Sequence, residues 1–353
     1  MGAAGGSPAP GRAGEREARP EPFTDSTSIA SDGRALAARM DEEGYVFVRG
    51  VLPRDALTAV RRALLALAAQ GGWLAPAHPL EAGIARAEAA CKDPEPEYLR
   101  VFRGMWCNEA LHRLKHHRAL VGLLERLLAA PVLVHPMFVL RNIFPRSERF
   151  DFTTKRHQDV VHIGGGTSYA AWVPLGDCPL EKGPLAVARG SHRFGVLDFR
   201  VGTGPGGMEI DEPPGCQWVS GGFEAGDVLV FRDTTVHQAL PNRTRELRQS
   251  FDARFQRRAD PVSDLSLRTY ASMLEWDEVY AGWRGHELRH YWRDLDLEVV
   301  PYDTGHYERR DRMAFAMAER GDRTAYDTLL RIVQRDADAA KRARAEALLA
   351  RLG

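Results

Sequence analysis

The segment Lys155-Arg156-His157-Gln158-Asp159 decides how the rest of this sequence is read. Side chains two apart on a strand point to the same face, so the imidazole of His157 and the carboxylate of Asp159 can reach one point in space. His237 follows the strand-like run Gly226-Asp227-Val228-Leu229-Val230-Phe231 and can supply a third ligand. Two imidazoles and one carboxylate on one face of a metal leave its other positions open, as in non-haem Fe(II) oxygenases. A His-x-Asp sequence alone is a weak signal, because a histidine with a hydrogen-bonded neighbour is common.

Arg248 strengthens this interpretation. It follows His237 in a segment that alternates like a strand, and it shares a parity with Ser250, Asp252 and Arg254. A guanidinium binds a carboxylate in bidentate geometry. A co-substrate with a terminal carboxylate would need such an anchor near the metal.

Strand-like runs recur from about residue 131 to residue 257, separated by Gly- and Pro-rich turns. Short strands without alternating helices predict a β-sandwich or jelly roll. Helices are expected before this core, including one from Asp32 to Glu43 and one from Asn108 to Ala129, and again after it. The loop from Asp198 to Gln217 is too long for a tight hairpin and is a candidate specificity element.

The chain is expected to have three parts. Residues 1–27 are rich in Gly, Ala, Pro and charge and are expected to be a disordered tail. Residues 28–300 would form the main domain, and residues 301–353 a C-terminal helical appendage that resembles one HEAT-like pair. A single pair cannot form a solenoid, so we expect it to pack on the barrel or to join two copies of the chain in a homo-oligomer.

Composition excludes several classes of function. The formal net charge of the 353 residues is zero, so bulk charge implies no nucleic-acid partner. No apolar run is long enough for a bilayer, and no secretory segment is recognisable, so a cytoplasmic protein without a membrane partner is expected. The four cysteines show no metal-binding spacing and are interpreted as free thiols.

Longer motifs give the sequence a family resemblance. The chain resembles the phytanoyl-CoA dioxygenase (PhyH) family of Fe(II)/2-oxoglutarate-dependent oxygenases, from about Gly44 to Trp292. The resemblance rests on His157-Gln158-Asp159, on Ala171-Trp172-Val173-Pro174-Leu175-Gly176-Asp177, on Gly183-Pro184-Leu185-Ala186-Val187-Ala188-Arg189-Gly190-Ser191-His192, and on His237 and Arg248.

The resemblance implies a double-stranded β-helix and a definite chemistry. It implies that His157, Asp159 and His237 hold Fe(II), that Arg248 pairs with the far carboxylate of 2-oxoglutarate, and that O2 is consumed. Oxidation of a small-molecule substrate, most often hydroxylation, would accompany decarboxylation of 2-oxoglutarate to succinate and CO2. Related halogenases lack a carboxylate at the position of Asp159, so its presence argues against halogenation.

Further residues are weaker candidates. Trp172 follows the metal motif and either lines the substrate pocket or fills the core. Thr154 is a candidate contact of 2-oxoglutarate, and so are Arg141 and Asn142 on the preceding strand.

Other polar residues could be functional by type but are better explained by structural roles. Ser191 and His192 are adjacent, which is wrong for a nucleophile and its base, and are expected in a turn. His162 belongs to the pocket or the surface. Three further histidines, at helical spacing and without an acidic partner, are expected on a helix surface: His112, His116 and His117.

The sequence is compatible with two functions. The first is a dioxygenase that oxidises a small molecule, and the preferred expectation is a compound of bacterial secondary metabolism. The second is a jelly-roll metal-binding, ligand-binding or sensor module without turnover, against which the intact ligand set and Arg248 weigh.

Overall fold

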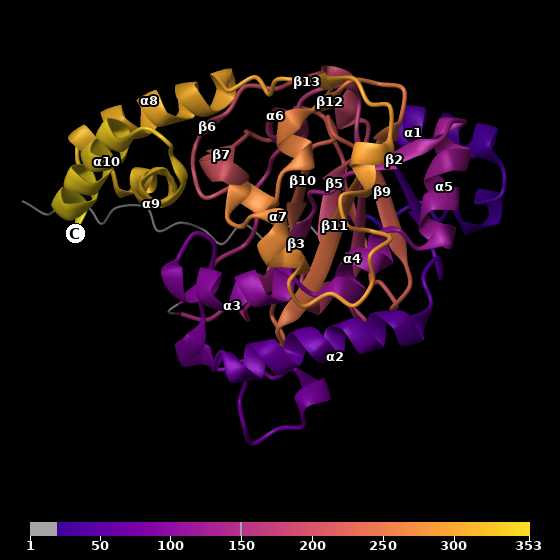
Figure 1. Cartoon of the computed structure of the whole chain (residues 1–353), viewed down its shortest axis with the longest axis horizontal. Coiled ribbons are helices and arrows are strands. Elements are labelled where there is room, and N and C mark those ends of the chain that lie inside the picture. The colour runs from indigo at the N-terminus through magenta and orange to yellow at the C-terminus, as the bar shows by residue number, and fades with distance from the viewer. Residues whose placement is uncertain (1–19, 149) are drawn as a thin grey trace, which may run out of the picture.

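The computed structural model of the chain describes residues 20–148 and 150–353 (Figure 1). Its α-helices are α1 (Gly33–Glu43), α2 (Arg54–Gln70), α3 (Pro96–Trp106), α4 (Glu109–Lys115), α5 (Arg118–Leu128), α6 (Val160–Ile163), α7 (Trp276–Tyr280), α8 (Gly305–Glu319), α9 (Tyr326–Arg335) and α10 (Ala339–Leu352). Its strands are β1 (Tyr45–Val48), β2 (Val132–Val134), β3 (Val139–Ile143), β4 (Tyr169–Pro174), β5 (Leu185–Ala188), β6 (Arg200–Val201), β7 (Met208–Glu209), β8 (Trp218–Ser220), β9 (Val228–Arg232), β10 (His237–Ala239), β11 (Arg248–Arg257), β12 (Val262–Ser263) and β13 (Val299–Val300).

Two antiparallel sheets organise the fold. The larger has the order β1-β9-β4-β11-β2, with β3 also paired to β11, and the smaller has the order β10-β5-β8. This confirms the prediction of a mainly β core with flanking helices. Strand β1 also joins the larger sheet, although it lies outside the predicted core of residues 131–257.

The larger sheet is covered on both faces. On β9, Leu229 and Phe231 pack in the cluster that joins the two sheets, whereas Val228 and Val230 pack in the cluster that includes α1, α2 and α5. All four side chains are fully buried. This is why the strand reads as a continuous apolar run rather than as an alternation of apolar and polar residues.

Local capping explains where several helices begin and end. Asp32 accepts hydrogen bonds from the backbone of Arg34 and Ala35, and Gly44 ends α1 with φ 80°, as the sequence predicted. The single helix predicted from Asn108 to Ala129 is wrong, because α4 ends at Lys115. The Nδ1 atom of His117 then accepts the N–H of Ala119 and starts α5.

The predicted end of the disordered tail, at residue 27, is too late in the sequence. Residues 1–19 lie outside the described residues, but residues 20–27 pack on the sheets. Glu21 forms a β-bridge with Val219, and Asp25 forms one with Phe47. Between them Phe23 is 8% exposed and contacts the ring of Tyr45. The apolar Phe23 holds this segment in place by filling the edge of the core.

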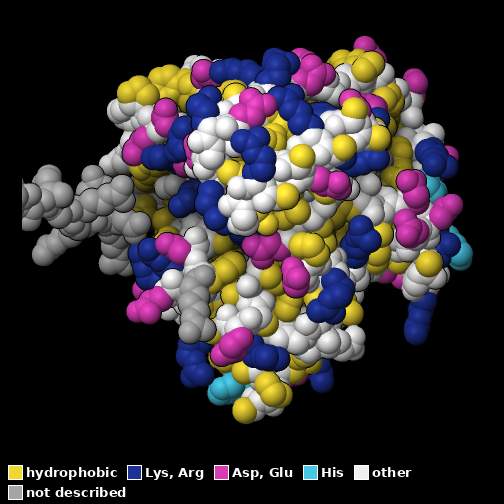
Figure 2. All heavy atoms as spheres, turned by 90° about the vertical axis from the view of Figure 1, so that its left-hand side faces the viewer, with side chains coloured by type: hydrophobic (Ala, Val, Ile, Leu, Met, Phe, Trp, Pro, Cys, Tyr) yellow, Lys and Arg dark blue, Asp and Glu magenta, His cyan; other side chains and the backbone are white. Residues whose placement is uncertain are grey.

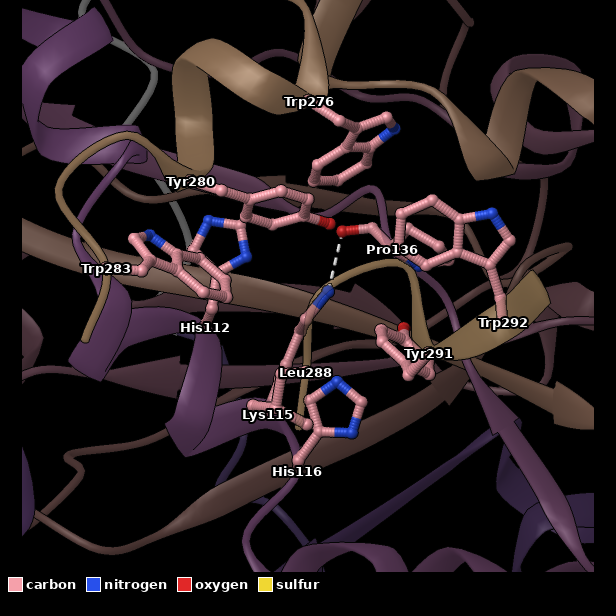
Figure 3. A pocket seen from close by; sticks show the side chains of 10 residues that line it. All are labelled: His112, Lys115, His116, Pro136, Trp276, Tyr280, Trp283, Leu288, Tyr291 and Trp292. Atoms are coloured by element: carbon pink, nitrogen blue, oxygen red, sulfur yellow. Dashed lines mark hydrogen bonds between the residues drawn. The ribbon is translucent and has the colours of Figure 1, made fainter. Parts of the chain in front are cut away.

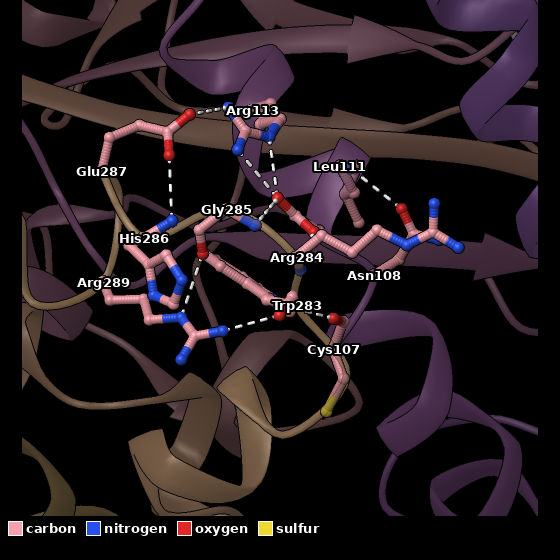
Figure 4. A network of polar contacts seen from close by, with 11 residues as sticks. Cys107, Asn108, Leu111, Arg113, Trp283, Arg284, Gly285, His286, Glu287 and Arg289 are labelled. Carbon is pink, nitrogen blue, oxygen red and sulfur yellow. Dashed lines mark hydrogen bonds and ion pairs between the residues drawn. The ribbon is translucent and has the colours of Figure 1, made fainter.

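The aromatic segment after the sheets is fixed to α4 (Figure 4). The indole nitrogen of Trp283 donates to the carbonyl of Cys107 over 2.9 Å. Arg113 forms ion pairs with Glu109, on its own helix, and with Glu287. The segment from Trp276 to Trp292 therefore packs on the main hydrophobic core.

The C-terminal helices form a small unit beside the sheets, in yellow in Figure 1, next to β6 and β7. Their apolar side chains gather around Phe315, Leu329 and Leu348, and Val201 from β6 joins this cluster. Basic and acidic side chains are interspersed on the face shown in Figure 2. Among the described residues, no helix combines the length and apolar character that crossing a bilayer requires. The division into domains and the association of copies through α8–α10 stay predictions.

Candidate metal centre and co-substrate site

Three buried side chains converge as the sequence predicted. One ligand atom from each of His157, Asp159 and His237 lies within 4.8 Å of the other two. The backbones of His157 and His237 exchange two hydrogen bonds of 3.1 Å, so the segment before α6 pairs with the start of β10. This pairing brings together two histidines that are far apart in the sequence.

Both imidazoles present the same nitrogen to the centre of this group. Nδ1 of His157 lies 2.8 Å from the carbonyl of Lys155, and Nδ1 of His237 lies 3.0 Å from that of Thr235. A carbonyl only accepts, so each Nδ1 carries the proton and each Nε2 keeps its lone pair. Burial lowers the pKa of both histidines, which keeps the rings neutral and able to bind a metal.

Asp159 completes the group in a different backbone conformation from the one predicted. Its φ of −76° and ψ of −25° are helical, because it precedes α6, so the expected strand through residues 155–159 is wrong at this residue. Its Oδ1 lies 3.8 Å from Nε2 of His157 and 3.9 Å from Nε2 of His237. The helical turn carries the carboxylate toward the imidazoles as well as a strand would have done.

Arg254 is the site residue whose role the sequence did not reveal. Its guanidinium lies 2.8 Å from Oδ2 of Asp159, and both side chains are buried. Burial raises the pKa of Asp159, but the surrounding charges, of which that of Arg254 is the strongest, together bring the pKa below its usual value, so the carboxylate is ionised. The sequence carries one indication of this role. Arg248 and Arg254 share a parity on β11, so both side chains point to the same face of the sheet.

Arg248 is buried and forms no ion pair with any residue that the structure describes. Its Nη1 donates to Oγ of Ser250 over 2.8 Å, while its Nε has no partner. No carboxylate of the described residues lies within ion-pair distance of it, and burial lowers its pKa. An uncompensated buried guanidinium is costly unless an anion joins it, so this position suits a carboxylate ligand.

The family follows from a comparison with known proteins. The family model described as phytanoyl-CoA dioxygenase (PhyH) matches residues 40–250. The chain belongs to this family. It is accordingly an Fe(II)/2-oxoglutarate-dependent oxygenase that acts on a small molecule, with O2 as the second co-substrate. The neutral imidazoles, the ionised carboxylate and the buried guanidinium of Arg248 fit these groups.

Individual proteins are also similar to this dioxygenase. The 1-deoxypentalenic acid 11-beta-hydroxylase of Streptomyces exfoliatus is 30% identical over 273 residues, which cover 72% of this chain and 90% of the relative. That of Streptomyces arenae is 28% identical over 275 residues, with the same shares covered. The solved structure of the epimerase SnoN from nogalamycin biosynthesis with Fe3+, alpha ketoglutarate and nogalamycin RO aligns with a TM-score of 0.48 at 22% identity, over 65% of this chain and 85% of that chain.

The motif from Gly183 to His192 packs beside one of the three candidate ligands, His237. Its strand β5 places Val187 opposite His237 in the small sheet. Oγ of Ser191 accepts the N–H of Val236 over 2.8 Å, and His192 contacts the carbonyl of Asp41. Ser191 and His192 therefore lie in a structural turn, as predicted, and support His237 from outside.

The weaker candidates occupy distinct places. Arg141 lies opposite Ser250 on the inward face of β3, whereas Asn142 faces outward and accepts a hydrogen bond from Gln249. Thr154 is buried, and its carbonyl accepts the N–H of Ala239, two residues after His237 on β10. The roles of Arg141 and Thr154 in binding 2-oxoglutarate stay predictions.

Trp172 belongs to the core. It is 1% exposed, its ring packs on Phe223, and the guanidinium of Arg248 lies 5.9 Å from its ring centroid. The sequence left open whether Trp172 fills the core or lines the substrate pocket. These contacts fit the core, and the role in the substrate pocket stays a prediction. The guanidinium of Arg248 thus lies over the face of the indole ring.

One of the histidines that the sequence placed on a helix surface is buried instead (Figure 3). His112 is 3% exposed and stands edge-on to Trp283 in an aromatic-lined pocket, so the prediction of a surface position is wrong for it. Lys115 lies in the same pocket and donates to the carbonyls of His135 and Pro136. The cluster is structural and is separate from the metal centre.

Proposed function

We propose that this dioxygenase hydroxylates a carbon atom of a small, largely apolar organic molecule, with His157, Asp159 and His237 as the iron ligands. The convergence of these three residues within 4.8 Å carries the proposal. Bound Fe(II), with 2-oxoglutarate and O2, supplies the oxidising chemistry and yields succinate and CO2.

The protein's own groups would divide the remaining tasks. Arg248 would bind the far carboxylate of 2-oxoglutarate, with Ser250 holding the guanidinium and Trp172 beneath it. Arg254 would keep Asp159 ionised and orient its Oδ1 toward the metal. Arg141 and Thr154 would make further contacts with the co-substrate.

The recess beside the metal centre supports an apolar substrate. It is narrow, and its polar lining is His157, Gln158 and His162. The rest of its lining is apolar: Val161, Leu197, Phe199, Met208 and Ile210. Such a wall binds hydrocarbon and offers few hydrogen bonds, as expected where an unactivated carbon is presented.

Hydroxylation and secondary metabolism are the finer parts of this proposal. The two curated relatives are hydroxylases named for 1-deoxypentalenic acid, which is a carboxylic acid. The carboxylate of Asp159 argues against halogenation, because as a metal ligand it would fill the position that a halide needs. We propose a similar tailoring reaction for this chain, with 1-deoxypentalenic acid as the first trial compound.

The decisive experiment separates a catalyst from a binding module. Anaerobic titration with Fe(II) and then 2-oxoglutarate, followed by exposure to O2, should give binding and then succinate. His157→Ala and Asp159→Ala should lose bound iron and succinate together, while His78→Ala, at an exposed histidine, should behave as the unmodified protein. Binding without succinate would favour the sensor module, and full activity of either ligand variant would refute the assignment.

A further inference from the structure

The wall of the recess is a loop held at two places. Residues 197–210 supply Leu197, Phe199, Met208 and Ile210 to the lining. At its start, the side chain of Gln158 donates to the carbonyl of Gly195 over 2.8 Å and accepts the N–H of Leu197 over 2.8 Å. Gln158 lies between two proposed iron ligands, so this end of the wall is fixed to the metal centre.

The tip of the same loop is wedged against the C-terminal helices. Gly206 and Gly207 have φ of 62° and 81°. A Cβ atom on Gly206 would lie 2.8 Å from Cε1 of His162, and one on Gly207 would lie 2.3 Å from Oγ1 of Thr328. Only glycine fits there, between the metal-side His162 and helix α9.

Helix α8 binds this tip and the neighbouring histidine. The hydroxyl of Tyr307 lies 2.9 Å from Nδ1 of His162, whose ring centroid is 6.4 Å from that of His157. Arg310 donates to the carbonyl of Gly206 over 2.6 Å. Two side chains of α8 therefore reach the residues that stand beside the metal centre.

The C-terminal helices are themselves fastened elsewhere. Arg331 and Arg335 of α9 pair with Asp93, and Asp327 pairs with Lys92. The first three of these side chains are largely buried, which makes the attachment firmer than an exposed ion pair. The helices thus connect the segment around Asp93 with the wall of the recess.

We propose that the C-terminal helices complete the substrate site, with Tyr307 as a positioning residue that fixes His162 and the 197–210 wall beside the iron. These helices lie outside the residues matched by the family model. The wall they hold is apolar, so they would determine which hydrocarbon portion of a substrate fits next to His157. The effect on catalysis rests on the proposed function, whereas the attachment of the wall to α8 does not.

The test removes one hydroxyl group. Tyr307→Phe should speed hydrogen exchange of peptides covering residues 160–163 and 197–210 by about threefold to tenfold, as expected for loss of one hydrogen bond. The KM for 2-oxoglutarate should not change, while succinate formation without organic substrate should rise, because the loosened wall admits water to the site. Tyr326→Phe, at an exposed tyrosine of α9, is the matched control and should change neither.

A second variant tests the same attachment from the side of the loop. Gly207→Ala should push the loop tip from Thr328 and give the same exchange pattern. Unchanged hydrogen exchange in both variants would overturn the proposal. Faster exchange without a rise in succinate formation in the absence of organic substrate would also overturn it, because a contact that only stabilises the fold gives that result. If the unmodified protein forms no succinate, the proposed function fails, and the exchange data still decide whether α8 holds the wall.

Discussion

The guanidinium of Arg254 lies 2.8 Å from Oδ2 of Asp159, while Oδ1 of the same carboxylate faces the imidazoles of His157 and His237. One oxygen is therefore engaged by the protein and the other is directed to the metal position. A partner of this kind fixes the orientation of a ligand and stabilises its ionised form.

Replacing Arg254 should weaken metal binding. We expect Arg254→Gln to lower the affinity for Fe(II) about tenfold to a hundredfold, because Asp159 loses its orienting charge. Anaerobic titration followed by iron analysis measures this. Arg258→Gln, at an exposed arginine just beyond β11, is the control. Equal affinities for the two variants would show that Asp159 needs no such partner.

Replacing Arg248 should affect the co-substrate and not the metal. Arg248→Gln should raise the KM for 2-oxoglutarate about a hundredfold, as expected for loss of a buried charge-assisted contact of about 3 kcal/mol. Iron binding should stay unchanged. The exposed Arg245 offers a control as Arg245→Gln. A normal KM in Arg248→Gln would place the far carboxylate elsewhere, with Arg141 as the next residue to replace.

His135 should make the fold sensitive to acid. Burial lowers the pKa of His135 to about 3, so the folded protein keeps it neutral, whereas in the unfolded chain it titrates near its usual value of about 6.5. Below that value the unfolded chain takes up a proton that the folded one refuses. Stability therefore falls as pH drops from about 6.5 toward 3, by about 2 kcal/mol at pH 5 from this residue.

Urea unfolding at pH 7.5 and pH 5 checks this contribution. His135→Gln should lose about 2 kcal/mol less stability between the two pH values than the unmodified protein does. His78→Gln removes an exposed histidine and should keep the full loss. An identical pH dependence for all three proteins would mean that His135 is protonated in the fold.

Gly183 should be intolerant of any side chain. It has φ 75°, and a Cβ atom would lie 2.3 Å from the carbonyl oxygen of Leu240. Gly183→Ala should therefore cost about 3 kcal/mol of unfolding free energy. Gly215 has φ 71° but nothing within 4 Å of its Cβ position, so Gly215→Ala should cost only about 1 kcal/mol. Similar losses would show that the loop at Gly183 can relax.

The sequence revealed most of the metal centre and little of its surroundings. The spacing of His157 and Asp159 and the alternation around Arg248 are local patterns, and local patterns survive in a single sequence. The pairing of Asp159 with Arg254 and the reach of Tyr307 to His162 depend on the crossing of distant segments, which no spacing encodes. The break after Lys115 was missed because the apolar stripe continues through it, and only the cap at His117 marks a new helix.

The paired backbones of His157 and His237 have a practical consequence. Amide–carbonyl bonds within the polypeptide set the spacing of the two backbone segments that carry the imidazoles, so this spacing does not depend on a bound ion. Metal uptake should need little rearrangement, and protein made in iron-starved cells should already be folded and ready to be loaded afterwards.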